Sequence, residues 1–276
     1  MGDFETSAPS SPAFDASASP WRSPLRVRTF DLFVVLVERR LRLFAKRSLL
    51  GLVWPTASPF VLLALYTFVF HKVFAVPIPR YPEFLLAGLL PWSLVSQGIP
   101  VAVTSISSEP ELVRRSWFRH EVLPLSAVAA LFINFLGGLT AFIVYLGIRG
   151  ELAVGLLPVL VVPIVSLVLL VSGLGVAVSL VDVYNRDLRW MIGNLLMIWF
   201  FLVPIVYSHE MTPGPARILR SIDPMNMIVG QFRDILYWGH VSQPAHMAVT
   251  LVFCALLCFG SVTVFRSLTK DLAKDV

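Results

Sequence analysis

The feature that constrains the fold most is a series of long apolar runs. About 20 apolar residues are enough to cross a bilayer core of about 30 Å. Lipid offers the backbone no hydrogen-bond partners, so such runs are expected to be helices. Only 14% of the 276 residues are charged, against about 25% in soluble domains. The sequence predicts an all-α membrane protein with six transmembrane helices, near residues 52–74, 84–107, 122–148, 155–181, 191–208 and 245–265.

The Lys and Arg residues predict the orientation of these spans. If both termini are cytoplasmic, most of the 22 basic residues fall in inner segments, as the positive-inside rule expects. The net charge of +5 is then explained by topology. A nucleic-acid partner is not expected, because the chain has no soluble basic module.

The first residues differ in composition from the rest. Residues 1–20 are rich in Ser, Ala and Pro, and they have no basic stretch followed by an apolar one, so a signal peptide is not predicted. This composition favours a disordered cytoplasmic tail over residues 1–22. The six-span membrane domain is expected at 51–270.

Between these two parts, residues 23–50 are expected to contain an amphipathic helix. Apolar residues recur at helical spacing, and charged residues fall on the opposite side, which is typical of a helix lying in the membrane interface. A first transmembrane span is the alternative, but basic residues crowd its end. The apolar set is Phe30, Phe33, Val34, Val37, Leu41 and Phe44, and the charged set is Asp31, Glu38, Arg39, Arg42 and Lys46.

The segment between the second and third predicted spans combines charges with two aromatic residues. Pro110 can open a helix, and Pro124 can mark entry into the next span. Trp117 and Phe118 stand together among Glu and Arg residues. An exposed aromatic pair surrounded by charge indicates docking onto a partner. The alternative is that the rings anchor the loop at the headgroup level.

The stretch before the last span is too polar to cross a membrane and too apolar for a plain loop. Asp223 and Pro224 can start a helix, and Gly239 can end one. Two short helices that dip into the outer leaflet fit this pattern, and such re-entrant backbone survives only where protein buries it or a cavity adjoins it. A small outer cap without a role in transport is the alternative.

No catalytic or metal-binding pattern is present in the sequence. The five His residues form no metal-ligand motif with carboxylates. A phosphate-binding Gly-rich loop of the Walker type is absent, so no ATP site of that kind is expected. Carboxylates that would mark an ion pathway are missing from the spans. The energy for any transport is therefore expected to come from another polypeptide.

Five stretches together carry a family resemblance. They are RSLLGLVWPTASPFVLLALYTFVFHKVF (47–74), FLLAGLLPWSL (84–94), LVRRSWFRHEVLPLS (112–126), NRDLRWMIGNLLMIWFFLVPIVYS (185–208) and SIDPMNMIVGQFRDILYWG (221–239). In this order and spacing they resemble the permease subunits of bacterial ABC polysaccharide exporters, which move O-antigen, capsule or teichoic-acid chains. The likeness runs from about Leu25 to Asp271.

The resemblance implies a function and a set of partners. It implies a six-span permease of the bacterial cytoplasmic (inner) membrane that forms a homodimer and docks two copies of an ABC ATPase subunit. ATP and Mg²⁺ would bind to the ATPase, and this chain would hold no cofactor. The expected substrate is a lipid-linked glycan surrounded by membrane lipids.

The resemblance also assigns roles to particular segments. It identifies residues 23–50 as the interface helix, residues 110–121 as the coupling helix that contacts the ATPase, and residues 213–239 as short gate helices near the outer exit. The family often has Pro where Arg119 stands, so this end of the coupling segment is expected to differ. The expected coupling residues are Pro110, Leu112, Arg115, Trp117, Phe118 and Arg119, and the expected gate residues are Asp223, Pro224, Asn226 and Arg233.

The charged turn between the fourth and fifth predicted spans fits the same family pattern. The turn consists of Asp182, Arg186, Asp187 and Arg189, and its Arg186 and Asp187 match the family's Arg-Asp-Leu-Arg sequence. The four charges are expected in the headgroup and water layer, where they fix the depth at which both helices leave the bilayer. Arg186 and Asp187 are candidates for pairing with the interface helix or the ATPase, and a purely topological role is the alternative.

Aromatic residues in the first and fifth predicted spans are candidates for a substrate path. Aromatic rings suit the apolar faces of sugar rings without gripping any one position. For each ring, contact with lipid or with neighbouring helices is the alternative interpretation. The candidates are Tyr66, Phe70, Trp199, Phe200 and Tyr207.

Two other functions compete with polysaccharide export. A permease of a drug or small-lipid ABC exporter would share the spans and the interface helix, but would often carry a larger outer domain. A membrane-embedded glycosyltransferase would need a group of Asp, Glu or His residues at a membrane face, and the sequence contains none.

Overall fold

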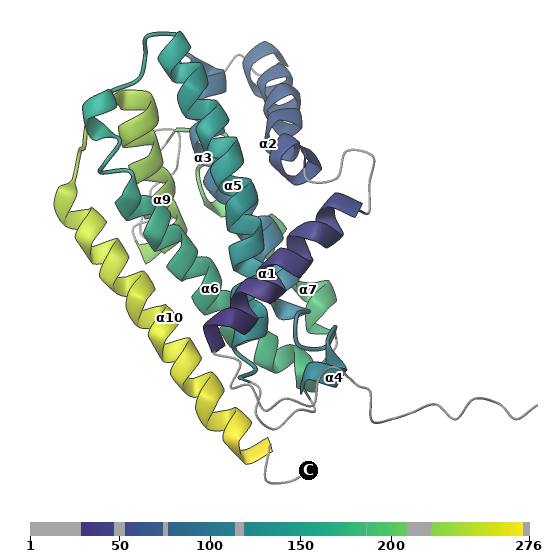
Figure 1. Cartoon of the computed structure of the whole chain (residues 1–276). Helices are drawn as coiled ribbons and strands as arrows, with labels where there is room; N and C mark the ends of the chain where they lie inside the picture. The colour runs from purple at the N-terminus through teal and green to yellow at the C-terminus, as the bar shows by residue number, and fades with distance from the viewer. Residues whose placement is uncertain are drawn as a thin grey trace, which may run out of the picture.

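The structure is a computed structural model, and it describes residues 29–46, 53–73, 77–113, 119–185, 187–208 and 222–272. All regular secondary structure within these ranges is helical. The predicted all-α class is therefore confirmed for the described part of the chain. Figure 1 shows the helices as a bundle in which most axes run roughly side by side.

Among the residues that the structure describes, four helices are long and apolar enough to cross a membrane. They coincide with the second, third, fourth and sixth predicted spans, with ends that differ by a few residues. They are α3 (Tyr81–Val103), α5 (Val122–Ile148), α6 (Val161–Tyr184) and α10 (Pro244–Leu272).

The first and fifth predicted spans form shorter helices. The first consists of α2 (Val53–Tyr66) and a π-helical segment, η2 (Thr67–Val73). The fifth is α7 (Leu188–Leu202), whose 15 residues rise only about 22 Å. The chain leaves the helix at Val203, and Pro204 cannot supply the next backbone donor. Six crossings therefore stay a prediction.

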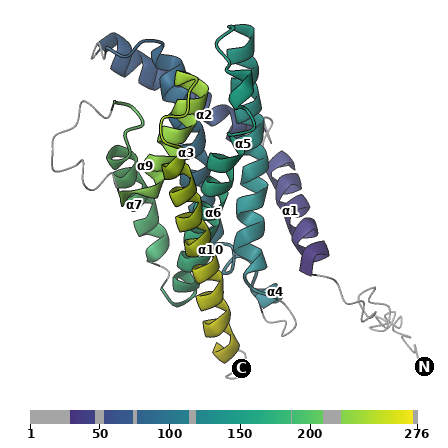
Figure 2. The ribbon, with the colours of Figure 1, turned by 90° about the vertical axis from the view of Figure 1, so that its left-hand side faces the viewer.

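Helix α1 (Thr29–Lys46) packs along α5, at one edge of the bundle (Figures 1 and 2). Leu36 is buried, and Leu32 and Phe33 pack beside it against a small cluster from the ends of α5, α6 and α10. Phe30 and Val34, from the predicted apolar face, stay 70% and 46% exposed. The helix thus contacts the bundle along one border of its apolar face, and Phe30 and Val34 of that face stay exposed.

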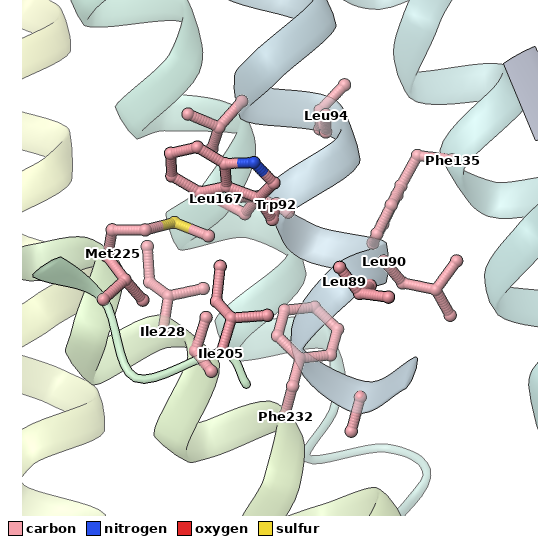
Figure 3. Packing of buried hydrophobic residues seen from close by; sticks show 14 of the residues in the cluster. Leu89, Leu90, Trp92, Leu94, Phe135, Leu167, Ile205, Met225, Ile228 and Phe232 are labelled. Atoms are coloured by element: carbon pink, nitrogen blue, oxygen red, sulfur yellow. The ribbon is translucent and has the colours of Figure 1, made fainter. Parts of the chain in front are cut away.

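The core is built around α3, which is buried along most of its length. The short helix α9 (Pro224–Arg233) and the π-helical η5 (Asp234–Trp238) pack against it. Met225, Ile228 and Phe232 of α9 belong to the same buried cluster as Leu89 and Leu90 of α3 (Figure 3). Burying this one face of α9 explains why a segment too polar to span lies within the bundle.

Helix α10 lies on the outside of the bundle along α6 (Figure 2). Gly173 allows this packing, since a Cβ at this position would stand 3.0 Å from the backbone of Cys258. Most of α10 is exposed and apolar, as expected of a helix that faces lipid. Two short elements, α4 (Pro110–Val113) and η3 (Val154–Leu156), lie at opposite ends of the bundle.

Candidate functional site

A groove of about 580 Å³ lies between α2, α3 and α7. One of its walls is aromatic, formed by Tyr66, Trp92, Phe200 and Phe201. The other combines apolar residues with the polar side chains of Ser93, Ser96 and Gln97. The groove contains no charged side chain among its lining residues.

The rings of the groove contact one another in a continuous set. Tyr66 stacks on Phe200 with 5.7 Å between ring centroids and an interplanar angle of 21°. Trp92 meets Phe200 at 5.5 Å and Trp199 edge-on at 5.9 Å. Phe70 lies 6.1 Å from Tyr66, one turn along the chain. The structure therefore brings together four of the five predicted aromatic candidates.

The fifth candidate, Tyr207, lies beyond the end of α7 and donates its hydroxyl to the carbonyl of Phe201 at 2.6 Å. Tyr207, Phe70 and Trp199 are not among the residues that line the groove, whereas Tyr66 and Phe200 are. Trp92, by contrast, was not among the predicted residues. A signal was available, because Trp92, Ser96 and Pro100 recur at helical spacing and place an aromatic and a polar residue on one face of α3.

A small polar cavity adjoins the groove and shares Pro59, Ser93 and Gln97 with it. Its volume of about 10 Å³ is about the room that one water molecule needs. Asn134 of α5 is 6% exposed and lines this cavity. Its Nδ2 has no hydrogen-bond partner among the described residues. A buried amide normally has a hydrogen-bond partner, so Asn134 is an exception among the described residues.

The predicted gate residues Asp223 and Pro224 form the start of α9. Oδ1 of Asp223 accepts a hydrogen bond from the backbone N–H of Met225 at 3.0 Å, and Pro224 takes the first helical position. Oδ2 of Asp223 accepts a second bond from Nε1 of Trp199 at 3.1 Å. Burial raises the pKa of Asp223, and these two hydrogen bonds act in the opposite direction.

The other two gate candidates lie on the buried face of α9. Asn226 is 8% exposed, and Arg233 is 4% exposed. Nη1 and Nη2 of Arg233 donate to the carbonyls of Pro204 and Ile205, each at 2.6 Å, and Nε donates to the carbonyl of Phe84 at 3.3 Å. Among the described residues no carboxylate pairs with it. The guanidinium instead satisfies carbonyls just beyond the C-terminal end of α7, where a helix favours a cation.

Part of the predicted coupling segment is described. Pro110 begins α4, Leu112 packs against the cluster that also contains α1 residues, and Arg119 is exposed. His120 Nε2 lies 2.9 Å from the carbonyl of Val113, which joins the two described ends of the segment. Arg115, Trp117 and Phe118 lie outside the described residues.

The predicted charged turn follows α6. Asp187 is exposed at the start of α7, and Arg186 lies outside the described residues. The other two charged residues of the predicted turn form an ion pair, and this pairing was not predicted. Nε and Nη2 of Arg189 donate to the carboxylate of Asp182 at 2.5 and 2.9 Å. An Asp at the end of an apolar run was the available signal, because a buried carboxylate needs a partner.

The end of the bundle near η5 carries a second polar group of residues. Arg80 donates to Glu151 at 3.1 Å and to the carbonyl of Tyr237 at 2.9 Å. Glu83, which is 4% exposed, accepts a hydrogen bond from the hydroxyl of Tyr145 at 2.9 Å. These contacts join α3, α5, the following loop and η5. In the described part of the chain, no three His, Cys, Asp or Glu side chains gather to hold a metal ion.

Comparison with known proteins finds similarity to export permeases. It is 28% identical over 247 residues to an O-antigen export system permease protein, RfbA, of Klebsiella pneumoniae, covering 89% of this chain and 95% of that protein. It is 27% identical over 252 residues, with the same two coverages, to the RfbA permease of Myxococcus xanthus. No family model matches the chain. The similarity over nearly the whole length confirms the resemblance that the sequence motifs indicated.

Proposed function

We propose that this chain, a homologue of O-antigen export permeases, is the transmembrane subunit of an ABC transporter that exports lipid-linked polysaccharide. The substrate would be O-antigen, teichoic acid or a similar cell-envelope glycan. The observation that carries this proposal, beside the homology, is the groove between α2, α3 and α7, with its aromatic wall and its Ser and Gln side chains.

The chemistry of the groove suits a polysaccharide. A sugar ring presents hydroxyl groups at its edge and apolar C–H groups on its faces. The rings of Tyr66, Trp92 and Phe200 offer flat apolar surface, and Ser96 and Gln97 offer hydrogen-bonding groups. Weak contacts of this kind repeat along a polymer, so they guide the chain without holding a single position. A groove without charge also matches a segment that crosses the membrane.

A separate ATPase would supply the energy. The sequence has no nucleotide-binding loop, so ATP and Mg²⁺ would bind to the partner, with two ATPase subunits for two permeases. The partner would contact residues 110–121. Glu109, which directly precedes these residues, pairs with Arg39 of α1 at 2.9 Å. This salt bridge connects the interface helix to residues 110–121, which we call the docking segment.

A second copy of the permease would complete the path. The groove is open along α2 and α7, where Leu65, Met197 and Phe201 are each more than half exposed. A homodimer through this side would enclose the groove between two copies. The exposed remainder of α1, including Phe30 and Val34, suits the surface of the inner membrane on the cytoplasmic side. Both termini would then be cytoplasmic, and α2 and α7 would complete six spans.

The function is tested in a strain that lacks this permease. We expect lipid-linked glycan to accumulate inside the cell and surface polysaccharide to disappear. Expression of the chain together with its ATPase should restore both. A strain that keeps its surface glycan but becomes sensitive to small lipophilic compounds would instead favour a drug or small-lipid exporter.

A further inference from the structure

The carboxylate of Asp182 joins three segments at the end of the bundle that carries α4. It lies in the last turns of α6, and its side chain has no exposed surface. Arg189, in the first turn of α7, donates to both carboxylate oxygens. The hydroxyl of Ser107, in the turn after α3, donates to Oδ2 at 2.9 Å.

This arrangement holds the start of α7 in one place. A cation near a helix N-terminus is unfavourable, because backbone N–H groups already make that end positive. Asp182 offsets the charge of Arg189 at this position. A buried carboxylate would in turn be unfavourable alone, because burial removes its water. Asp182 and Arg189 therefore hold each other in place at the junction of α6 and α7.

Arg189 also lies in line with the groove. Counting from Arg189 along α7, steps of four, three and four residues lead to Gly193, Leu196 and Phe200. These spacings place all four residues on one face of the helix. Gly193, Leu196 and Phe200 line the groove. A shift or rotation of α7 at Arg189 would therefore displace the aromatic wall that includes Phe200.

Ser107 connects the same carboxylate to the segment that leads into α4. Only Ser108 separates Ser107 from Glu109, which pairs with Arg39, and α4 begins at the next residue, Pro110. The turn over 104–109 is therefore held from two sides, by α1 and by Asp182. Any displacement of α4 acts first on this turn.

We propose that Asp182 is a positioning residue that makes α7 follow the turn at 104–109, so that movement of the docking segment changes the groove. The inference rests on the proposed function, because it needs an ATPase that acts on residues 110–121. Asp182 itself does not line the groove. Its effect passes through Arg189 on one side and Ser107 on the other.

The test uses a cysteine reporter in the groove. Gly193→Cys suits this purpose, because Gly193 lines the groove and a Cβ there meets nothing within 4 Å. The native thiols are removed as Cys254→Ala and Cys258→Ala. The permease is reconstituted in nanodiscs with the ATPase of its export system. The rate of maleimide labelling is measured with and without a non-hydrolysable ATP analogue.

Two variants test whether the contacts of Asp182 transmit movement to the groove, without preventing the permease from folding. The double variant Asp182→Asn/Arg189→Gln removes both charges, so neither is left buried alone. Ser107→Ala removes only the bond between the turn and Asp182. We expect both to bind the ATPase as the parent does. The double variant should lose the nucleotide dependence of labelling, and Ser107→Ala should reduce it.

The matched control is Arg80→Gln/Glu151→Gln, which removes an ion pair at the opposite end of the bundle. It should keep the nucleotide dependence. If labelling of the double variant responds to nucleotide as the parent does, the inference is overturned and the proposed function stands. The inference is also overturned if the parent permease binds the ATPase but its labelling does not change with nucleotide. A permease that binds no ATPase overturns the proposed function as well.

Discussion

Trp199 and Asp223 join the groove to the start of α9, since the indole Nε1 of Trp199 donates to Oδ2 of Asp223 at 3.1 Å. One belongs to the aromatic set predicted as a substrate path, and the other to the predicted outer gate. The same carboxylate caps α9 through the N–H of Met225. Any change in the orientation of Trp199 therefore acts directly on the first turn of α9.

Trp199→Phe is expected to weaken this connection while keeping an aromatic ring. Asp223 would lose a donor, and a lost hydrogen bond to a charged group costs about 1.5–3 kcal/mol. We expect a lower melting temperature in detergent and less surface polysaccharide at equal permease abundance. Trp190→Phe is the control, because Trp190 is 83% exposed and should tolerate the change. Equal melting temperatures for the two variants would contradict the role of the hydrogen bond.

Gly88→Ala is expected to disturb the site of Arg233. A Cβ at residue 88 would lie 3.1 Å from Nη2 of Arg233 and 3.3 Å from Cγ2 of Ile205. The guanidinium is held by three carbonyls, so it has little freedom to move away. We expect a loss of about 1–3 kcal/mol, as for overpacking of a core, measured as a fall in melting temperature.

Gly230→Ala is the matched control for that variant, because Gly230 lies within α9 and a Cβ there meets nothing within 4 Å. Replacing Gly by Ala inside a helix usually stabilises it by up to about 1 kcal/mol. The two substitutions should therefore shift the melting temperature in opposite directions. A fall of equal size in both would show that close contact with Arg233 is not the cause.

Arg233→Lys should be poorly tolerated despite keeping the charge. A planar guanidinium donates to the carbonyls of Pro204, Ile205 and Phe84 from fixed directions, whereas an ammonium group is a compact donor on a flexible stem. We expect at least one carbonyl to lose its partner, at a cost of about 1–3 kcal/mol. Limited proteolysis between α7 and α9 should become faster. Unchanged cleavage would show that Arg233 does not hold residues 203–206.

The sequence predicted the helical class because long apolar runs have one stable backbone solution in lipid. The C-terminal end of the fifth span was predicted too late, because α7 ends at Leu202. Pro204 follows closely, and the carbonyls of Pro204 and Ile205 bind Arg233 instead of continuing the helix. Predicting that turn would have required knowing that an Arg almost thirty residues later lies against these carbonyls. Contacts at this sequence separation leave no periodic pattern in the chain.

The candidate site, like the fold, could be predicted only where it depends on local sequence and not on how the helices pack. The aromatic candidates Tyr66 and Phe200 could be identified from composition, but their stacking depends on how α2 meets α7. Arg186 and Asp187 drew attention because they match a motif, whereas Arg189 pairs with Asp182. Arg186 and Arg189 stand three residues apart in the sequence. The pairing of Arg189 with Asp182 depends on how α6 and α7 lie relative to each other, which the sequence does not show.

Asn134→Leu is expected to preserve or raise stability, unlike most substitutions of buried polar residues. Nδ2 of Asn134 has no partner among the described residues, so an apolar side chain of similar size removes an unsatisfied group. Thr250→Val is the comparison, because the hydroxyl of Thr250 donates to the carbonyl of His246 and accepts from Gln231. That variant should lose about 1 kcal/mol for its broken bonds. The melting temperatures of both variants in detergent check this. If Asn134→Leu is the less stable of the two, the amide has a bound partner, and the small cavity beside Gln97 holds a water molecule that contributes to the packing of α3 against α5.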